Sequence, residues 1–347
     1  MKTTSLFLRK ILHLLMSTGV VLATLVACNN DDLMKNPEVN REKDTIVKEK
    51  ENDTIVEESK PRSPLSVVYI ETKNSLLTNV DCIRMEDGSP AFDIAVIFAG
   101  NINLDAEGKA EVRLNPAVTN LLENNITHVR QLQEAGIKVL LSILGNWDEA
   151  GWSCFESYED AKAYAARVRD VVERYGLDGI EIDDEYSKCP DQSNNRSLIW
   201  ACHAIRKAMP DKIIAKALGV YGHGAREDLS YKYNGKKLSD LLDYGWTMSY
   251  WAVSKAEINN YLDNGFSKSQ LGEGIAVNPD AGANSTPKVS AVKAAEYVID
   301  NDLGVLMFFE LKYNSNGGNY LTDVFDTLYG QQIRICPDGL KNSSYGN

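Results

Sequence analysis

The chain has 347 residues, 44% of them hydrophobic, so it is long enough to bury one large core, and a single barrel can absorb most of it. Its 49 Asp and Glu residues outnumber 37 Lys and Arg residues and give a formal net charge of -12. This acidic balance argues against nucleic acid as a partner and is compatible with a neutral carbohydrate.

Residues 1–28 have the pattern of an export signal. An apolar run from residue 11 to residue 27 follows three basic residues, Lys2, Arg9 and Lys10. The run ends in Leu-Val-Ala before Cys28 and resembles a bacterial lipobox, which implies that Cys28 is lipidated and begins the mature chain. A transmembrane anchor is the alternative, but the run is short for a full span. We therefore expect a lipoprotein of the bacterial outer membrane that is held at the cell surface by its lipid.

Residues 29–63 are polar and charged. The sequence Asp-Thr-Ile-Val occurs at residues 44–47 and again at residues 53–56, without enough apolar surface to fold. Charged linkers extend by self-repulsion. The segment is predicted to be a disordered tether that holds the folded domain away from the membrane.

The chain contains six cysteines. If Cys28 carries lipid, an odd number remains, so not all of them can pair within the chain. Cys154 and Cys189 both follow predicted strands on the same rim, which makes their pairing conceivable in an exported protein. The chain has no Cys-x-x-Cys sequence and no cluster of histidines, so we expect neither a metal nor a cofactor.

Beyond residue 64, short β-branched or apolar runs alternate with amphipathic stretches of helix length, which is typical of repeated βα units. The predicted strands are residues 66–71, 93–98, 138–144, 179–183, 212–218, 246–250, 272–277 and 305–309. The clearest predicted helices are residues 163–175, which stop at Gly176, then 196–209 and 289–299. Eight strands in this length fit an α/β protein of the (β/α)8 TIM barrel type, which usually needs about 250 residues. The barrel is expected to span residues 64–332, with a C-terminal tail over residues 333–347. A doubly wound sheet is the alternative, but no Gly-rich phosphate-binding sequence follows the first strand.

The fourth predicted strand ends in acids. Because side chains alternate along a strand, Glu181, Asp183 and Glu185 share one face, while isoleucines pack on the other. Carboxylates this close cannot all ionise at neutral pH, so at least one should keep its proton. Such an acid can protonate the leaving oxygen of a glycosidic bond. The alternatives are a solvated acidic rim and a cation site.

The stretch Asp178-Gly179 followed by Asp183-x-Glu185 resembles the signature of glycoside hydrolase family 18, and residues 177–186 resemble its endo-β-N-acetylglucosaminidases. The family usually has Asp where this chain has Glu181, which preserves the charge. The resemblance implies hydrolysis of the GlcNAc-β-1,4-GlcNAc core bond of N-glycans, the expected partners, by a retaining mechanism in which the substrate forms an oxazolinium. It implies that Glu185 is the acid and base and that Asp183 orients the acetamido group.

Other strand ends supply candidate substrate contacts. Residues 98–103 are similar to a segment of the F-type endoglycosidases, and Asn101 and Asn103 there are equally compatible with substrate contacts and with a polar turn. Residues 138–145 resemble a second family block, in which Ser142 points inward by strand parity. It either hydrogen-bonds an inner carboxylate such as Glu181 or fills a barrel layer. Trp147 follows in a loop, where it can stack on a sugar or belong to a local core.

Residues 248–251, Met-Ser-Tyr-Trp, resemble the family's Met-x-Tyr, which implies that Tyr250 hydrogen-bonds the acetamido oxygen and that Met248 shares its face. Trp251 is a further substrate-binding candidate. Residues 307–310 lack the tryptophan that chitinases of the family carry there, which weakens a chitinase reading. Glu310 is either a substrate contact or part of a rim salt bridge.

Two alternatives to this enzyme remain. One is a chitinase-like hydrolase, and the other is a surface lipoprotein that binds glycans on an inactive barrel. Glu185 favours an enzyme, whereas the change at Glu181 keeps the binding protein open. We expect a monomer. The preference for high-mannose, hybrid or complex glycans depends on loop shapes that spacing does not encode.

Overall fold

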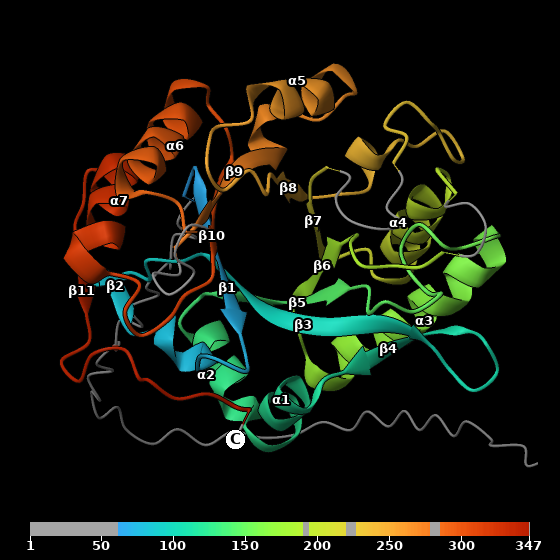
Figure 1. Ribbon diagram of the computed structural model, residues 1–347, viewed down its shortest axis with the longest axis horizontal. Helices are drawn as coiled ribbons and strands as arrows, with labels where there is room; N and C mark the ends of the chain where they lie inside the picture. Colours follow the sequence, from blue (N-terminus) through green and yellow to red (C-terminus); the bar gives the residue numbers. More distant parts are fainter. Residues whose placement is uncertain (1–61, 190–193, 220–226, 278–284, 347) are drawn as a thin grey trace, which may run out of the picture. The chain divides into compact units, whose positions relative to one another are not determined.

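The structure, a computed structural model, describes residues 62–189, 194–219, 227–277 and 285–346. The predicted signal, including Cys28, and most of the predicted tether lie outside the described residues. Eight parallel strands form a closed barrel, because β1 pairs with both β10 and β3 (Figure 1). The barrel strands are β1 Leu65–Glu71, β3 Ile94–Leu104, β5 Lys138–Leu144, β6 Gly179–Asp183, β7 Ile213–Ala217, β8 Tyr244–Trp246, β9 Leu271–Ala276 and β10 Val305–Phe309. The predicted (β/α)8 barrel is confirmed.

Helices surround the strands in the part of the chain that is described (Figure 1). They are α1 Pro116–Thr119, α2 Ile126–Glu134, α3 Tyr158–Tyr175, α4 Ser197–Ala208, α5 Lys255–Asp263, α6 Lys288–Asp300 and α7 Tyr320–Tyr329. The longest of them, α3, begins where the Ser157 hydroxyl accepts the Asp160 N–H and ends at Gly176, whose φ of 58° is left-handed, as predicted. No described helix combines the length and the apolar character that crossing a membrane requires.

Two layers of buried side chains hold the fold. The inner layer fills the barrel with residues from six of its strands, among them Val67, Val96, Leu140, Trp246 and Met307. The larger outer layer lies between the strands and the helices. Residues on one strand therefore alternate between the barrel interior and the helices, which decides where the side chain of each strand residue points.

One predicted strand is misplaced. Residues 246–250 were predicted to form a strand, but β8 ends at Trp246. The N–H of Thr247 still bonds to the Gly272 carbonyl at 3.0 Å, and the chain then turns, with the Tyr250 N–H bonded to the Met248 carbonyl at 2.9 Å. The prediction that Met248 and Tyr250 share one face of a strand is therefore wrong, because the apolar alternation continues beyond the point where the chain leaves the sheet.

The number of helices also differs from a regular barrel. Within the described residues, neither the β1–β3 connection nor the β7–β8 connection contains an α-helix. The first holds the 3-10 turn η1 Leu77–Asn79 and strand β2 Ile83–Met85, and the second holds η3 Leu238–Asp240. The remaining short elements are β4 Ala110–Leu114, which pairs antiparallel with β3, the π-turn η2 Asn120–Asn124, η4 Lys268–Gln270 and η6 Gly317–Asn319.

The C-terminal residues occupy the place of the missing first helix. Strand β11 Ile333–Ile335 pairs antiparallel with β2, and a disulfide joins Cys82 to Cys336. In Figure 1 both strands lie between α7 and α2. Further on, the side chain of Tyr345 is buried, and its hydroxyl accepts the Leu77 N–H at 3.1 Å. The segment beyond residue 332 is therefore packed onto the barrel wall.

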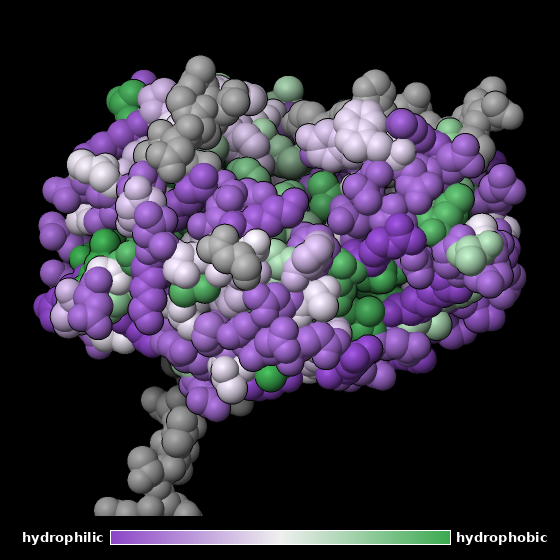
Figure 2. Space-filling view, turned by 60° about the horizontal axis from the view of Figure 1, so that its bottom comes forward, coloured by the Kyte–Doolittle hydropathy of each residue, from purple (hydrophilic) through white to green (hydrophobic). Residues whose placement is uncertain are grey.

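Figure 2 shows one face of the molecule coloured by hydropathy. Hydrophilic residues cover most of this face, and the apolar residues gather in small groups rather than in one broad patch. Such a surface is usual for a folded domain in water.

Candidate active site

Strand β6 carries two acids into the barrel interior. Glu181 pairs with Ser142 of β5 in the ladder. Ser142 lies two positions after Leu140 on β5, and Leu140 faces inward. The alternate residues Ile180 and Ile182 belong to the outer layer, against the helices. Glu181 and Asp183 therefore share the inward face, and Ser142 points inward, as strand parity predicted.

Glu181 is fully buried at the bottom of this group. Its Oε1 accepts the N–H of Ala217, on β7, at 2.8 Å. Burial raises the pKa of the Glu181 carboxyl to about 7, while Ser142, Ala217 and the Tyr69 hydroxyl lower it. The Ser142 Oγ adjoins the carboxyl but lies outside strict hydrogen-bond geometry. The inner carboxyl is thus poised to gain or lose a proton near neutral pH.

Asp183 and Glu185 lie nearer to solvent. Asp183 is 5% exposed, and burial together with the charges of Glu181 and Glu185 raises its pKa well above the ordinary value. Glu185 follows the end of β6 and is partly exposed; burial raises its pKa, and a hydrogen bond from Tyr186 opposes that rise. The charges of the three carboxyl groups affect one another, so the groups titrate together and no single pKa belongs to one residue alone.

Aromatic rings surround these acids at the barrel mouth. Tyr69 of β1 is buried, and the charges of Glu181 and Asp183 add to the effect of burial in raising the pKa of its hydroxyl. Trp246 donates its ring N–H to that hydroxyl at 3.0 Å. Tyr250 stacks on Phe309, with ring centroids 5.7 Å apart and planes at 19°. The Tyr250 ring therefore reaches the mouth from a turn rather than from a strand.

The turn that carries Tyr250 is held from below by Glu273 of β9. Glu273 is 1% exposed and accepts the Thr247 hydroxyl at 2.7 Å and the Ser254 N–H at 3.1 Å. Burial raises the pKa of Glu273 to about 7. A hydrogen bond from Thr286 to the Tyr250 carbonyl fastens the same turn. Sequence reasoning missed Glu273, because nothing in its strand distinguishes it from a rim acid.

Sequence reasoning also missed Tyr69 and Trp246. They belong to β1 and β8, far from β6 along the chain, and each reads as a core aromatic. The available signal was parity, because Tyr69 lies two positions beyond the inward-facing Val67 and near the end of its strand. Parity places a side chain but does not assign it a hydrogen-bond partner.

Two predicted substrate contacts line one cavity. Asn101 and Trp147 belong to a cavity of about 230 Å³ at the ends of β1, β3 and β5, which Tyr186 and Glu71 also line. Trp147 is 49% exposed, and its ring lies 5.4 Å from that of Tyr186. Trp251, on the other side of the mouth, is 55% exposed. Exposed rings of this kind can stack on the apolar faces of sugars.

Two further predicted contacts, Asn103 and Glu310, are buried. Asn103 is 3% exposed and donates its amide N–H to Asp148 at 2.9 Å, which ties β3 to the loop after β5. Glu310 is 3% exposed and pairs with Lys312 at 3.5 Å. Burial and the neighbouring Glu71 raise the pKa of Glu310 to about 7. Both residues therefore make protein contacts at the rim.

The conceivable disulfide is present. Cys154 and Cys189 are bonded on the rim beside the acids, with Cα atoms 4.9 Å apart. Cys202 is a buried free thiol. In the described part of the chain, no cluster of His, Cys, Asp and Glu side chains is arranged to hold a metal ion.

Comparison with known proteins identifies several relatives. The family model described as glycosyl hydrolases family 18 matches residues 66–272. An endo-beta-N-acetylglucosaminidase of Flavobacterium sp. (strain SK1022) is 35% identical over 272 residues, which cover 77% of this chain and 81% of that protein. Endo-beta-N-acetylglucosaminidase F1 of Elizabethkingia meningoseptica is 34% identical over 176 residues, 48% of this chain and 50% of that protein.

Solved structures show the same likeness. EndoBT-3987 of Bacteroides thetaiotamicron, solved with a Man5GlcNAc product, has a TM-score of 0.68 and 27% identity. That comparison covers 82% of this chain but only 64% of the longer EndoBT-3987 chain. A group II chitinase domain of Ostrinia furnacalis has a TM-score of 0.56 over 82% of this chain and 99% of that chain. Its 17% identity makes this a likeness of fold alone.

Proposed function

This chain belongs to glycosyl hydrolase family 18, and from that membership we propose that it is an endo-β-N-acetylglucosaminidase. The enzyme hydrolyses the GlcNAc-β-1,4-GlcNAc core bond of N-glycans and so releases the glycan from a glycoprotein. The observation that carries the proposal is the 35% identity, over 77% of the chain, with the Flavobacterium enzyme of that name. The acids at the end of β6 supply the chemistry that this reaction needs.

The proposed mechanism follows from the positions of the acids. Asp183 and Glu185 are two residues apart at the end of one strand, so they approach a substrate from the same side. A conventional nucleophile and acid would have to act on opposite faces of the scissile bond, and this family is an exception to that pattern. The 2-acetamido oxygen of the substrate therefore attacks its own anomeric carbon. The bond to the leaving oxygen breaks as an oxazolinium forms.

Three side chains carry this reaction. Glu185 gives its proton to the leaving oxygen and then takes a proton from the water that opens the oxazolinium, so the anomeric configuration is retained. Asp183 accepts the acetamido N–H and stabilises the positive charge that develops there. Tyr250 donates its hydroxyl to the acetamido oxygen. The exposed rings of Trp147 and Trp251, with Asn101 in the adjoining cavity, contact the sugars on either side.

The test is a digest of a small panel of glycoproteins, including ribonuclease B and an antibody, followed by mass spectrometry. The expected product is a protein that keeps one N-acetylglucosamine on each cleaved asparagine. Glu185→Gln should lose this activity by about 10² to 10⁴ while circular dichroism shows a folded protein. Glu134→Gln, at an exposed position on α2, is the matched control and should keep full activity.

Other outcomes would replace the proposal. Turnover of unbranched chitin oligomers without cleavage of glycoproteins would make the protein a chitinase. Glycan binding by the unmutated chain without turnover would make it a glycan-binding protein. Full glycan release by Glu185→Gln would remove Glu185 from the mechanism.

For localisation, we propose a lipoprotein of the outer membrane that is displayed at the cell surface. The support is the sequence pattern before Cys28 and the polar stretch over residues 29–63. Incorporation of a labelled fatty acid into the protein, lost in Cys28→Ala, tests the anchor. Digestion of the protein by protease added to intact cells tests surface display, and protection until the outer membrane is opened would contradict it.

For oligomeric state, we propose a monomer. The face in Figure 2 offers no broad apolar patch, and a stable dimer usually buries a sizeable, well-packed surface. Sedimentation velocity at several protein concentrations should give one species of the monomer mass. A mass that rises with concentration would contradict this.

A further inference from the structure

Two loops at the barrel mouth are joined through their backbones. The first, residues 145–155 after β5, is called here the clamp loop, and the second, residues 184–189 after β6, carries the proposed acid. The Gly145 N–H bonds to the Glu185 carbonyl at 3.0 Å, and the Trp147 N–H bonds to the Tyr186 carbonyl at 2.6 Å. The Lys188 N–H bonds in the other direction, to the Asp148 carbonyl at 2.7 Å. The backbone at Glu185 and after it is therefore attached to the clamp loop.

The two loops are also in close contact. A Cβ atom on Gly145 would lie 2.2 Å from the Glu185 carbonyl oxygen, and one on Gly151 would lie 2.0 Å from the Ser187 Oγ. Ser187 is fully buried between the loops. On the other side of Glu185, Asp184 accepts the Ser153 hydroxyl at 2.6 Å. No larger side chain fits at either glycine without moving the acid loop.

The disulfide joins the far ends of these loops. Cys154 lies at the end of the clamp loop and Cys189 at the end of the acid loop, 35 residues apart in sequence. The disulfide thus closes the segment that the backbone bonds at Glu185, Tyr186 and Lys188 attach to the clamp loop. The second disulfide, Cys82–Cys336, lies on the wall of the barrel and closes one end of the antiparallel β2–β11 pair.

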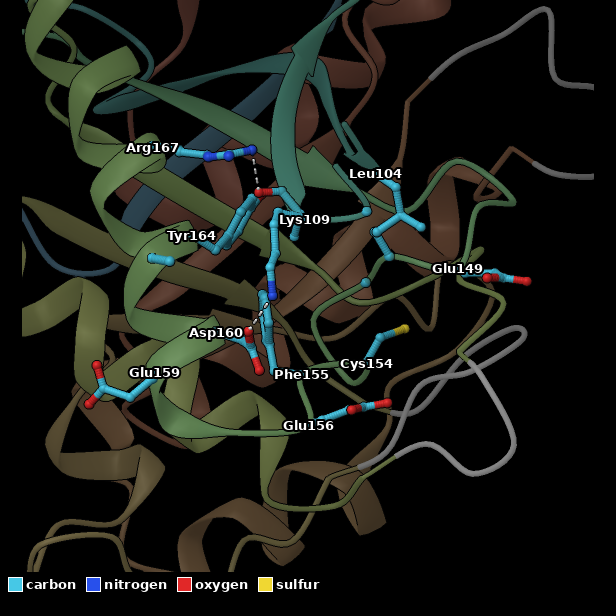
Figure 3. A pocket seen from close by; sticks show the side chains of 15 residues that line it. Leu104, Lys109, Glu149, Cys154, Phe155, Glu156, Glu159, Asp160, Tyr164 and Arg167 are labelled. Carbon is cyan, nitrogen blue, oxygen red and sulfur yellow. Dashed lines mark hydrogen bonds and ion pairs between the residues drawn. The ribbon is translucent and has the colours of Figure 1, made fainter. Parts of the chain in front are cut away.

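The opposite side of the clamp loop borders an open space. A cavity of about 610 Å³ lies between the loop, the β3–β4 hairpin and α3. Figure 3 shows Glu149 and Cys154 of the loop on one side of it and Lys109 and Asp160, joined by an ion pair, on the other.

The loop itself is anchored to the core, because Trp152 is fully buried and donates its ring N–H to the Ile143 carbonyl at 2.7 Å. The Phe155 N–H bonds to the Ser197 hydroxyl at 2.8 Å. The clamp loop is therefore a fixed support against which the acid loop is held.

We propose that the Cys154–Cys189 disulfide and the clamp loop are a positioning device for Glu185, which keeps its carboxyl at the leaving oxygen. The inference rests on the proposed function. An acid must lie within hydrogen-bond reach of the atom it protonates, and a displacement of about 1 Å can cost about 10²-fold in rate. The device acts through Glu185 and touches no reacting atom. Because the clamp loop also carries Trp147, a proposed sugar contact, releasing it should lower the turnover number by a much larger factor than it raises KM.

The test compares the two disulfides. Cys154→Ser with Cys189→Ser should lower kcat by about 10- to 100-fold, a much larger factor than any rise in KM. Cys82→Ser with Cys336→Ser is the matched control, which should lower the melting temperature but keep kcat in the folded protein. A folded Cys154/Cys189 variant with the wild-type kcat would overturn the proposal, as would equal losses of kcat in the two variants.

A second variant tests the clamp without touching a disulfide. Gly145→Ala introduces a Cβ where the Glu185 carbonyl now lies, so it should displace Glu185. Because Gly145 also lines the cavity beside Asn101 and Trp147, kcat should fall by a larger factor than KM rises. Gly317→Ala is its control, because nothing lies within 4 Å of the added Cβ there. A wild-type kcat in the Gly145→Ala variant would contradict the proposal that the clamp loop positions Glu185.

One readout does not depend on activity. Carbon-13 NMR of the Glu185 carboxyl should show its pKa falling toward the ordinary value in the Cys154/Cys189 variant, because a released acid loop exposes the carboxyl to water. The Cys82/Cys336 variant should leave that pKa unchanged. If the unmutated protein failed to release glycans, the proposed function would be wrong. The titration would still show whether the disulfide and the clamp loop hold Glu185 in place. An unchanged Glu185 pKa in the Cys154/Cys189 variant would contradict the proposal that the disulfide and the clamp loop position Glu185.

Discussion

Glu181 is the deepest of the β6 acids, and it occupies the position where the resembled family usually has Asp. Its longer side chain accepts the backbone N–H of Ala217 on the next strand, so the carboxyl is anchored rather than loose. Its charge also raises the pKa of Asp183. Glu in place of Asp at position 181 therefore keeps the inner carboxyl coupled to Asp183. The sequence alone could not predict whether this coupling would be kept.

We expect Glu181→Gln to move the low-pH limb of kcat/KM to lower pH. The amide still offers an oxygen to the Ala217 N–H, but it removes the negative charge that raises the pKa of Asp183, so Asp183 becomes the carboxylate that its acetamido role requires at lower pH. Glycan release measured from pH 4 to pH 9 gives the profile, and Glu134→Gln is the control with an unchanged profile. A limb that stays in place or moves upward would contradict the coupling.

Tyr250→Phe should lower kcat by roughly 10²-fold, the usual cost of removing one hydrogen-bond donor from developing charge. The Phe ring keeps the stacking on Phe309, so the melting temperature should stay near that of the wild type. Steady-state kinetics on a released-glycan assay and a thermal melt give the two readouts. An unchanged kcat would mean that the hydroxyl does not contact the reacting group.

At the scale of elements, the bounds of a strand could be predicted from sequence where the strand is buried on both faces. The strands at residues 138–144, 179–183 and 305–309 have the predicted bounds, because each is an apolar run that ends at turn residues or acids. Strand β8 was misplaced, since Met248 and Tyr250 continue the alternation although the chain has already left the sheet. Strand parity then predicted that the acids point inward. It did not predict the hydrogen bond from Trp246 to Tyr69, because these residues meet only when the barrel closes.

Strand β9 carries a second test, through Glu273. Its pKa is about 7 in the folded protein and about 4.3 when unfolded, so between these values the folded state binds more protons. The free energy of unfolding should therefore fall as pH rises through that window. Glu273→Gln removes this fall in stability, because glutamine does not titrate. Its amide oxygen can accept the Ser254 N–H, and its NH2 can donate to the Thr247 hydroxyl oxygen, which reverses that bond.

We accordingly expect Glu273→Gln to gain stability relative to wild type as pH rises from 5 to 8, by at most roughly 3 kcal/mol at about 1.4 kcal/mol per pKa unit. Urea unfolding at each pH measures the difference, and Glu134→Gln should show none. A difference that does not change with pH would mean that Glu273 does not titrate in this window.

At the scale of the whole molecule, the barrel depends on its C-terminal residues. Among the described residues the β1–β3 connection has no α-helix, and β11 with Tyr345 covers that part of the wall. Sequence reasoning treated residues 333–347 as a tail, because a three-residue strand and one tyrosine carry little periodic signal. Packing against η1, at the other end of the chain, is a long-range contact that local pattern does not encode.

Tyr345→Ala should lower the free energy of unfolding by about 3 to 5 kcal/mol, as for other large buried rings. Tyr345→Phe should lower it by about 1 to 3 kcal/mol, because the buried Leu77 N–H loses its acceptor. Tyr313→Phe, at a ring that is 45% exposed, is the control. Chemical denaturation measures all three, and equal values for Tyr345→Phe and wild type would show that the hydroxyl contributes nothing.

The Cys82–Cys336 bond spans 254 residues and so encloses nearly the whole barrel in one covalent ring. A protease that cuts any single surface loop inside this ring leaves the two fragments connected. Nicked protein should therefore migrate as one species until a reductant is added, and it can keep its native arrangement after damage that would split an open chain.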